Sequence, residues 1–352
     1  MSIPWVYSTA GFGFLLNLPG DGSVTVNSSG AIDWAVVAQK QMDFWITTTP
    51  GTPSPTAGAV AAPIYKQYAD AVGHAPPLPS YAALFWQCRL RYRTQQILED
   101  IALGYHQRNL SLGVVVVDFM NQKRDGDFHM NPVCFPNISS MTSRVKSLTG
   151  AQTMVSFWPD VKPDADAAAA LSAEGCINSG TIDPTSQKCR DFIWSKYIKP
   201  NYVDQGVTDY WLDEDDMHSM APILPGETER APSQAYGRMW ANDWMAVFGD
   251  GLRKSRNEGV ILTRAVWAGA ARLGVVLWSS DIWSTFEELT AQVPEGVAAS
   301  ISGIPWCVWT DPLTLCPWIQ TLVINGLSVA GGLQVDHGRR GIWVPNIPIQ
   351  QH

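Results

Sequence analysis

The feature that most constrains this chain is an alternation of apolar strands and helical segments that begins at Tyr81. Short apolar runs such as GVVVVDF, QTMVSFW and VVLWSSD are separated by polar segments with helical periodicity. The predicted helices cover about residues 94–108, 139–148, 186–203, 232–257 and 284–292. Continuous apolar strands between helices are typical of a parallel sheet covered on both faces. About six or seven such units predict an α/β fold, a (β/α)8 barrel of the TIM type.

Two segments of different character flank the predicted barrel. Residues 1–48 contain short runs rich in β-branched and aromatic side chains, separated by Gly and Asp turns, which predicts β structure. Residues 51–63 are rich in Pro, Gly, Ala and Thr and are predicted to form a loop, followed by a short helix near Tyr65–Val72. We therefore divide the chain into an N-terminal β part with its linker (1–62), a barrel (63–311) and a C-terminal tail (312–352).

Acidic residues recur where the apolar strands stop. Asp118 follows VVVV, Asp213 follows YWL, and Asp281 follows VVLWSS. The carboxyl ends of barrel strands meet on one face, which is where active sites form, so these three side chains are expected to converge. The alternative for each acid is a structural one, because an Asp at the end of a strand often caps the next helix.

Charge and aromatic content indicate the class of ligand. The net charge of −8 argues against nucleic acid and against an anionic membrane surface, because both favour a basic face. Sixteen Trp residues offer flat apolar faces with a polar edge, which suit sugar rings, although core packing is the alternative for any one of them. A neutral carbohydrate is therefore the expected partner.

The sequence gives no indication of a cofactor or a metal. The six His residues form no HExxH or similar pattern, and the six Cys residues form no CxxC pair. A chain of 352 residues does not need disulfides for stability, so we expect mostly free, buried thiols. No signal peptide is recognised at the start, and no apolar run reaches membrane-spanning length. The compartment and the oligomeric state are left open.

Glycoside hydrolysis would use two of the strand-end acids. It needs two carboxyl groups on either side of the scissile bond, one of them protonated. Asp281 lies between apolar runs, a setting that would raise its pKa and suit an acid. Asp213 begins an acidic cluster that continues to Asp216, and it would serve as the ionised nucleophile.

Several motifs, in order along the chain, resemble glycoside hydrolase family 31. They are FWQCRLRYRT (85–94), VVVVDFM (114–120), GDFHMNPVCFPN (126–137), VSFWPDV (155–161), DYWLDEDD (209–216), ILTRAVWAGAARLGVVLWSSDI (261–282) and SGIPW (302–306). That family contains α-glucosidases and α-xylosidases with a (β/α)8 barrel and a retaining mechanism. The resemblance spans about residues 63 to 306 and implies the same fold and reaction here.

The resemblance also implies roles for individual residues. Asp213 matches the family's nucleophile, and Asp281 matches its acid/base. Asp118 matches an Asp that binds sugar hydroxyls, and Arg264 matches an Arg that binds the sugar beside the nucleophile. The aromatic side chains that match walls of the sugar pocket are Trp211, Trp278 and Trp158.

The chain departs from the family pattern at several positions. Asp216 stands where the family has Glu, and Ser280 stands where it has Gly. After Trp306 the family continues with a Gly-rich segment that is absent here, where only Asp311 could correspond. His337 and Gly338 resemble a substrate-binding pair, but their surroundings do not fit. These departures predict a truncated member whose barrel is incomplete. The resemblance then implies that residues 1–62 are a β-sandwich remnant with its linker, 63–311 the catalytic (β/α)8 barrel and 312–352 an atypical C-terminal tail.

Three functions are compatible with these observations. The leading one is a retaining α-glycosidase that acts on α-glucosides or α-xylosides, between which the sequence does not distinguish. The second is a catalytically dead fragment with at most weak carbohydrate binding. The third, a metal-dependent hydrolase, is disfavoured because no cluster of His and Asp ligands is present.

Overall fold

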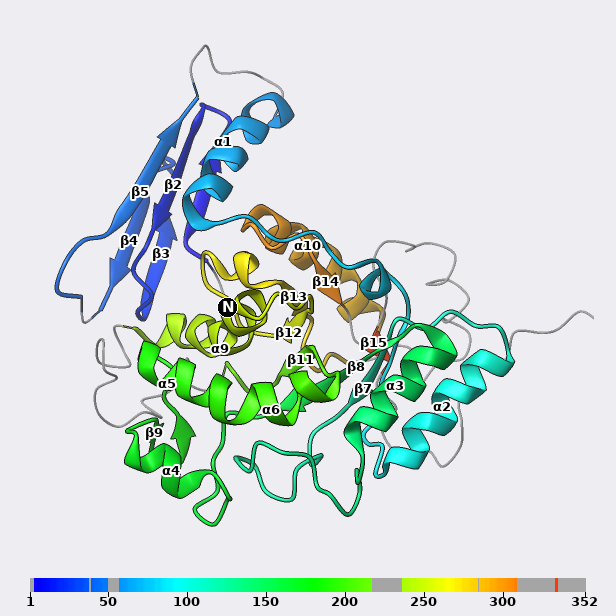
Figure 1. Ribbon diagram of the computed structural model, residues 1–352. Coiled ribbons are helices and arrows are strands. Elements are labelled where there is room, and N and C mark those ends of the chain that lie inside the picture. The colour runs from blue at the N-terminus through cyan, green and yellow to red at the C-terminus, as the bar shows by residue number, and fades with distance from the viewer. Residues whose placement is uncertain are drawn as a thin grey trace, which may run out of the picture.

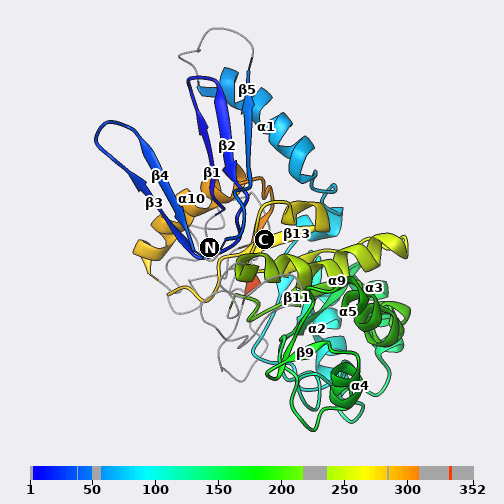
Figure 2. The same ribbon diagram turned by 90° about the vertical axis from the view of Figure 1, so that its left-hand side faces the viewer.

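The protein has two parts, a small N-terminal β structure and a larger helix-covered parallel sheet (Figures 1 and 2). The computed structural model describes residues 3–37, 39–49, 57–216, 236–283, 285–308 and 333–334. The C-terminal tail proposed for 312–352 therefore lies outside the described residues, apart from 333–334. Asp311, His337 and Gly338 lie outside them as well.

Eight parallel strands form the main sheet, and their order is β14-β13-β12-β11-β8-β7-β6-β15. The strands are β6 (Trp86–Gln87), β7 (Val114–Val117), β8 (Gln152–Phe157), β11 (Asp209–Leu212), β12 (Ile261–Thr263), β13 (Val275–Trp278), β14 (Cys307–Val308) and β15 (Leu333–Gln334). From β6 to β14 they neighbour one another in chain order, and β15 pairs with β6 in the position of an eighth barrel strand. The predicted TIM-type barrel, incomplete in the described residues, is confirmed.

The strands of the barrel are apolar throughout because both of their faces are buried. In β7, Val114 and Val116 pack inside the barrel with Trp86 and Met154. Val115 and Val117 point the other way and join the core between the sheet and its helices. This alternation is the two-residue period of a strand, and here each side has an apolar partner.

Helices cover the outer face of this sheet, as Figure 1 shows. They are α2 (Gln95–Gln107), α3 (Ile138–Thr149), α4 (Ala168–Ala173), α5 (Gln187–Ile193), α6 (Lys199–Asn201), α9 (Trp240–Lys254) and α10 (Phe286–Ile301). Thr94 and Asn137 cap α2 and α3 by accepting hydrogen bonds from Ile97 N and Ser140 N. Helix α10 continues through Pro294 to Ile301, well beyond the predicted end at about residue 292.

The N-terminal part consists of short antiparallel strands. A three-stranded sheet contains β1 (Trp5–Ser8), β2 (Phe12–Leu16) and β5 (Phe44–Thr48), and a separate hairpin contains β3 (Gly22–Val26) and β4 (Ile32–Val36). Helix α1 (Ala57–Val72) packs on β2 and β5. The prediction of a loop up to residue 63 was wrong, because the alanines of this segment favour a helix that accommodates Pro63.

Helix α1 connects the N-terminal sheet to the barrel. Tyr68 stacks on Trp5 of β1 with ring centroids 4.3 Å apart. Its hydroxyl donates a hydrogen bond to Ser302 O, 3.2 Å away, at the end of α10. The same side chain thus contacts a β1 residue and the end of a barrel helix.

The cysteines only partly match the expectation of free thiols. Cys88, Cys134 and Cys307 are free. Cys176 and Cys189 form a disulfide between the residue before β9 (Ile177–Asn178) and helix α5, so the prediction was wrong for this pair. The pairing depends on a chain reversal that brings the two residues together, which their spacing alone does not reveal. Of the helices in the described residues, none has the length and apolar character that crossing a membrane requires.

Candidate active site

The three strand-end acids lie near one another at the carboxyl ends of the barrel strands. Asp118 directly follows β7, Asp213 directly follows β11, and Asp281 follows β13 by three residues. The charges of Asp213 and Asp281 both raise the pKa of Asp118, so the three carboxyl groups are close enough to interact. Burial is the larger influence and brings the pKa of Asp118 to about 7.

Asp213 is buried and hydrogen-bonded on both carboxyl oxygens. Its Oδ2 accepts a hydrogen bond from Trp158 Nε1, 3.1 Å away, and its Oδ1 accepts one from Glu214 N at 2.9 Å. Its backbone N–H donates to Phe157 O at 3.0 Å, which continues the pairing of β11 with β8. Burial raises the pKa of Asp213 to about 6, while the nearby charge of Arg264 lowers it.

Arg264 is held by three carboxyl groups from the segment that follows β11. Its Nε lies 2.8 Å from Asp216 Oδ1, its Nη2 lies 2.9 Å from Glu214 Oε2, and its Nη1 lies 3.6 Å from Asp213 Oδ1. The strand register explains these contacts, because Leu212 pairs with Thr263 and the following residues are therefore neighbours. Asp216, which departs from the family's Glu, still forms an ion pair with the arginine.

The predicted pocket-wall tryptophans occupy two kinds of position. Trp211 and Trp278 are buried inside the barrel, where their rings meet edge to face at 4.9 Å. The Arg264 guanidinium lies over the Trp278 ring, 5.8 Å from its centroid. Trp158 is only partly buried, stacks on Phe119 at 5.1 Å and bonds to Asp213. Trp158 is thus the one of the three that is both accessible and in contact with an acid.

Asp281 differs from the expectation based on its neighbours in sequence. Its side chain is exposed, whereas Asp213 is buried, so the predicted apolar setting of Asp281 is wrong. The reason is that β13 ends at Trp278, and the next residues lead the chain out to the surface. Ser280 adopts a φ of 66°, in the left-handed region that favours glycine.

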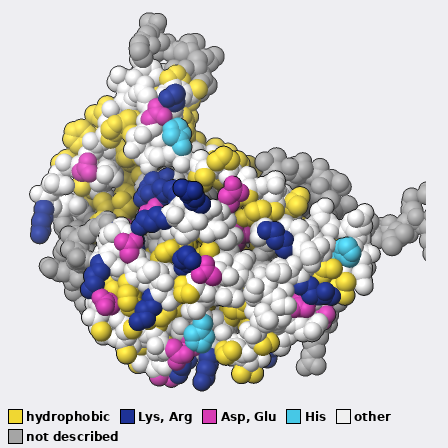
Figure 3. Space-filling view, in the orientation of Figure 1, with side chains coloured by type: hydrophobic (Ala, Val, Ile, Leu, Met, Phe, Trp, Pro, Cys, Tyr) yellow, Lys and Arg dark blue, Asp and Glu magenta, His cyan; other side chains and the backbone are white. Residues whose placement is uncertain are grey.

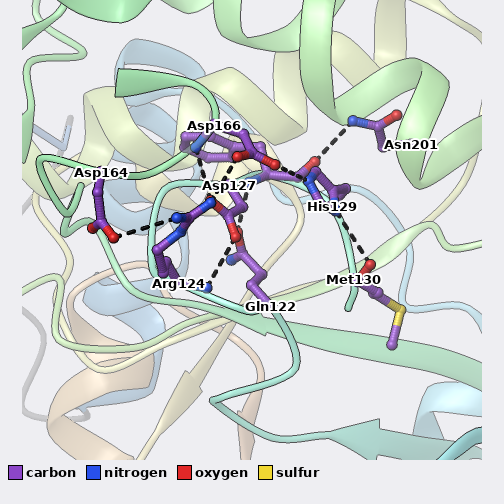
Figure 4. A network of polar contacts seen from close by, with 9 residues as sticks. Gln122, Arg124, Asp127, His129, Met130, Asp164, Asp166 and Asn201 are labelled. Carbon is purple, nitrogen blue, oxygen red and sulfur yellow. Dashed lines mark hydrogen bonds and ion pairs between the residues drawn. The ribbon is translucent and has the colours of Figure 1, made fainter. Parts of the chain in front are cut away.

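A network of ion pairs connects the loops after β7 and β8 (Figure 4). Arg124 lies 3.4 Å from Asp127 Oδ1 and 2.7 Å from Asp166 Oδ1, and His129 Nε2 lies 2.8 Å from Asp166 Oδ2. The ligand atoms of Asp127, His129 and Asp166 are close enough to hold a cation. Arg124 already provides a positive charge to two of these carboxylates. That the protein needs no metal stays a prediction.

Sequence analysis missed two contacts in the acidic cluster. It singled out Asp213 but assigned no partner to Glu214, and it treated Asp216 only as a departure from the family. It also gave no role to Asp215, whose carboxyl group is buried against Thr263. The signal available was the run of four acids, since so many carboxylates at the end of a buried strand require positive or hydrogen-bonding partners.

Comparisons with known proteins identify the family of the barrel. The family model "Glycosyl hydrolases family 31 TIM-barrel domain" matches residues 75–309. The "Uncharacterized family 31 glucosidase ORF2" of Pseudescherichia vulneris is 35% identical over 331 residues, which cover 89% of this chain and 60% of that protein. Alpha-xylosidase A of Aspergillus niger is 27% identical over 356 residues, with 87% of this chain and 46% of that protein covered.

A solved structure extends the likeness to three dimensions. The crystal structure of a family 31 α-xylosidase from a soil metagenome, complexed with xylose, superposes with a TM-score of 0.80 at 30% identity. The match covers 95% of this chain and 52% of that one, so the chain spans about half the length of these relatives. The family match includes the barrel strands from β6 to β14 and all three strand-end acids. The chain belongs to glycoside hydrolase family 31.

Proposed function

We propose that this chain carries the catalytic part of a retaining α-glycoside hydrolase that acts on α-xylosides or α-glucosides. The observation that supports the proposal best is the setting of Asp213. It is a buried carboxylate at the end of β11, beside Arg264, and its charge interacts with those of Asp118 and Asp281.

Asp213 would be the nucleophile. Its pKa of about 6 makes the carboxylate the main form at neutral pH, and Trp158 and the Glu214 amide orient its two oxygens. In the first step a carboxylate oxygen attacks the anomeric carbon as the bond to the leaving oxygen breaks, which gives a covalent glycosyl-enzyme. The Arg264 charge beside it favours the ionised form that this step requires.

Asp281 would be the acid and base. Its exposed carboxyl group is accessible to the leaving oxygen of a bound substrate and to the water that enters in the second step. It would protonate the leaving oxygen in the first step and remove a proton from water in the second. Asp118 would then be left to bind hydroxyl groups of the sugar, and with a pKa of about 7 it is available both as donor and as acceptor.

The proposed substrate is an α-linked xylose or glucose unit. Relatives named α-xylosidase and relatives named α-glucosidase both match this chain, and the metagenomic α-xylosidase was solved with xylose. The two sugars differ by a hydroxymethyl group, so discrimination between them depends on a few contacts in the pocket.

The test is hydrolysis of aryl α-xylosides and α-glucosides by the purified chain. Asp213→Ala and Asp281→Ala are compared with Asp164→Ala, which removes an exposed carboxylate of the Arg124 network. We expect release of the aryl group by the parent chain and by Asp164→Ala, and loss of at least about 10³-fold in Asp213→Ala. Release that persists in Asp213→Ala would rule out this nucleophile.

A second function is favoured by the departures of the sequence from the family pattern. After Trp306 the sequence no longer follows the family pattern, so a catalytically dead family member with weak carbohydrate binding is the alternative. Folded parent chain that binds xylose or glucose but releases no aryl group from either substrate would favour it. Turnover that disappears in Asp213→Ala would exclude it.

A further inference from the structure

The buried carboxyl group of Asp215 has an unusual set of partners. It is 1% exposed, and it lies two residues after Asp213 in the segment whose other carboxyl groups form ion pairs with Arg264. Its Oδ2 is hydrogen-bonded to Thr263 Oγ1 at the end of β12, and its Oδ1 has no partner among the described residues. Among the described residues no Lys, Arg or His forms an ion pair with Asp215, and the Arg264 guanidinium is paired with Asp213, Glu214 and Asp216.

The hydrogen bonds of Thr263 indicate which group is the donor. Its hydroxyl lies 3.0 Å from Ala265 O, which can only accept, and 3.2 Å from Ala265 N, which donates to it. A hydroxyl has one hydrogen, so it cannot donate to both Ala265 O and Asp215. If Asp215 is protonated, it donates to Thr263 Oγ1, Thr263 donates to Ala265 O, and every hydrogen has an acceptor.

We infer that Asp215 is a neutral carboxylic acid in the folded protein and that its hydroxyl group donates to Thr263 Oγ1. Thr263 then closes a turn around Arg264 through both polar atoms of the Ala265 backbone. Asp215 is thereby a positioning residue for Arg264, which it never touches directly. A neutral acid also avoids most of the cost of burying a charge without a cation beside it.

The electrostatic surroundings agree with this assignment. Burial raises the pKa of Asp215 well above its usual range, and the charges of Asp216 and Asp213 raise it further. The Thr263 hydrogen bond and the Arg264 charge lower it. Within the described residues, these groups from the segment after β11 and the end of β12 are the charged and polar neighbours that shift the pKa of Asp215.

Carbon-13 NMR of labelled aspartate carboxyl groups in the full chain tests the protonation state. The spectrum is recorded at about pH 8, above the pKa values of Asp118, Asp209 and Asp213, which are about 7, 7 and 6. We expect one signal with the chemical shift of a neutral acid, and Asp215→Asn should remove it. If the signal removed by Asp215→Asn has the shift of an ionised carboxylate, the inference is wrong.

The same spectra test the positioning role through Asp213. Because the Arg264 charge lowers the pKa of Asp213, a displaced arginine should raise it. Asp215→Leu has no hydrogen-bond donor and should raise the titration midpoint of the Asp213 signal. The amide of Asp215→Asn can donate to Thr263, so this variant should keep the midpoint of the parent chain. An unchanged midpoint in folded Asp215→Leu would overturn the role. If this variant does not fold, Thr263→Val gives the same comparison.

The consequence for catalysis rests on the proposed function. In an active enzyme, Asp215→Leu should lower kcat by about 10²-fold with a smaller effect on KM, because the substitution displaces Arg264 beside the nucleophile. A parent chain without turnover would contradict the proposed function. The NMR signals of Asp215 and Asp213 would still decide the protonation and the positioning.

Discussion

The two largest influences on the pKa of Asp213 oppose each other: burial raises it, and the charge of Arg264 lowers it. Burial raises the pKa to about 6, and the Arg264 charge limits that rise. A nucleophile must be ionised, so activity should be present above about pH 6 and should decline as pH falls through that value. The acid limb of the pH profile therefore includes the ionisation of this carboxyl group.

Removal of the arginine should shift that limb. In Arg264→Ala, kcat/KM should fall by about 10²-fold, and the acid limb should move to higher pH because the strongest influence that opposes burial at Asp213 is lost. The measurement is kcat/KM against pH, with Arg253→Ala, an exposed arginine of α9, as the control. An acid limb that stays in place in Arg264→Ala would mean that Arg264 does not act on the ionisation of the nucleophile.

Ser280, next to Asp281, is held in an unfavourable backbone conformation. Its φ of 66° costs a non-glycine residue about 1 kcal/mol, so Ser280→Gly should raise the free energy of unfolding by about that amount. Urea unfolding measures the change, with Ser279→Gly as the matched control because residue 279 has no positive φ. A loss of stability in Ser280→Gly would show that the Ser280 side chain contributes more than its backbone strain costs.

The sequence predicted the location of a site residue only where that residue directly follows an apolar strand. Asp118 and Asp213 were found because each directly follows an apolar strand. The partners of Glu214 and Asp216 were not, because they depend on the register of β11 against β12. The exposure of Asp281 was mispredicted because its apolar sequence neighbours do not cover its side chain.

At the scale of elements, the loops that follow β7 and β8 are joined through Asp127. This carboxyl group accepts hydrogen bonds from Arg124 N at 2.9 Å and Asp166 N at 2.8 Å, and its side chain is fully buried. Asp118 and Trp158 are the first residues after these two strands, at the start of the two loops. The network therefore fixes the segments that follow two site residues.

Asp127→Ala should destabilise the protein more than removal of an exposed member of the same network. It leaves two backbone N–H groups without their acceptor, which should lower the free energy of unfolding by about 1–3 kcal/mol. Asp164→Ala, whose side chain is 74% exposed, should change it by less than about 0.5 kcal/mol. Urea unfolding of both variants makes the comparison, and equal effects would contradict a special role for Asp127.

The elements of the barrel were largely predictable, and two of the exceptions involve proline. Strands such as β7 are continuous apolar runs because both faces are covered, so their sequences identify them. Helix α1 was predicted too short because the segment before Pro63 resembled a loop, and α10 was predicted to end before Pro294. In both cases tertiary packing overrides the local preference of proline to interrupt a helix.

For the whole molecule, the N-terminal sheet leaves apolar side chains exposed on the face away from α1. Phe44 and Ile46 of β5 are each more than half exposed, and so is Val26 of β3 in the separate hairpin. Figure 3 shows hydrophobic side chains gathered over these N-terminal strands. Such a patch promotes association in water, since it is normally covered in a stable protein.

A polar substitution on this face should reduce self-association without affecting catalysis. Ile46→Thr keeps a β-branched side chain and should shift light-scattering profiles toward monomer at the same concentration. Thr48→Val, on the same face of β5, is the matched control and should have the opposite effect. Unchanged profiles in both variants would show that this face does not drive association.

The central claim concerns the covalent role of Asp213, and trapping of the intermediate tests it most directly. A fluorinated α-xylosyl or α-glucosyl fluoride forms a glycosyl-enzyme quickly and releases it slowly, so that the labelled peptide can be identified by mass spectrometry. The account predicts one glycosyl unit per chain, attached to Asp213 and absent in Asp213→Ala. A label on another residue, or no label on folded chain that hydrolyses the aryl substrate, would contradict it.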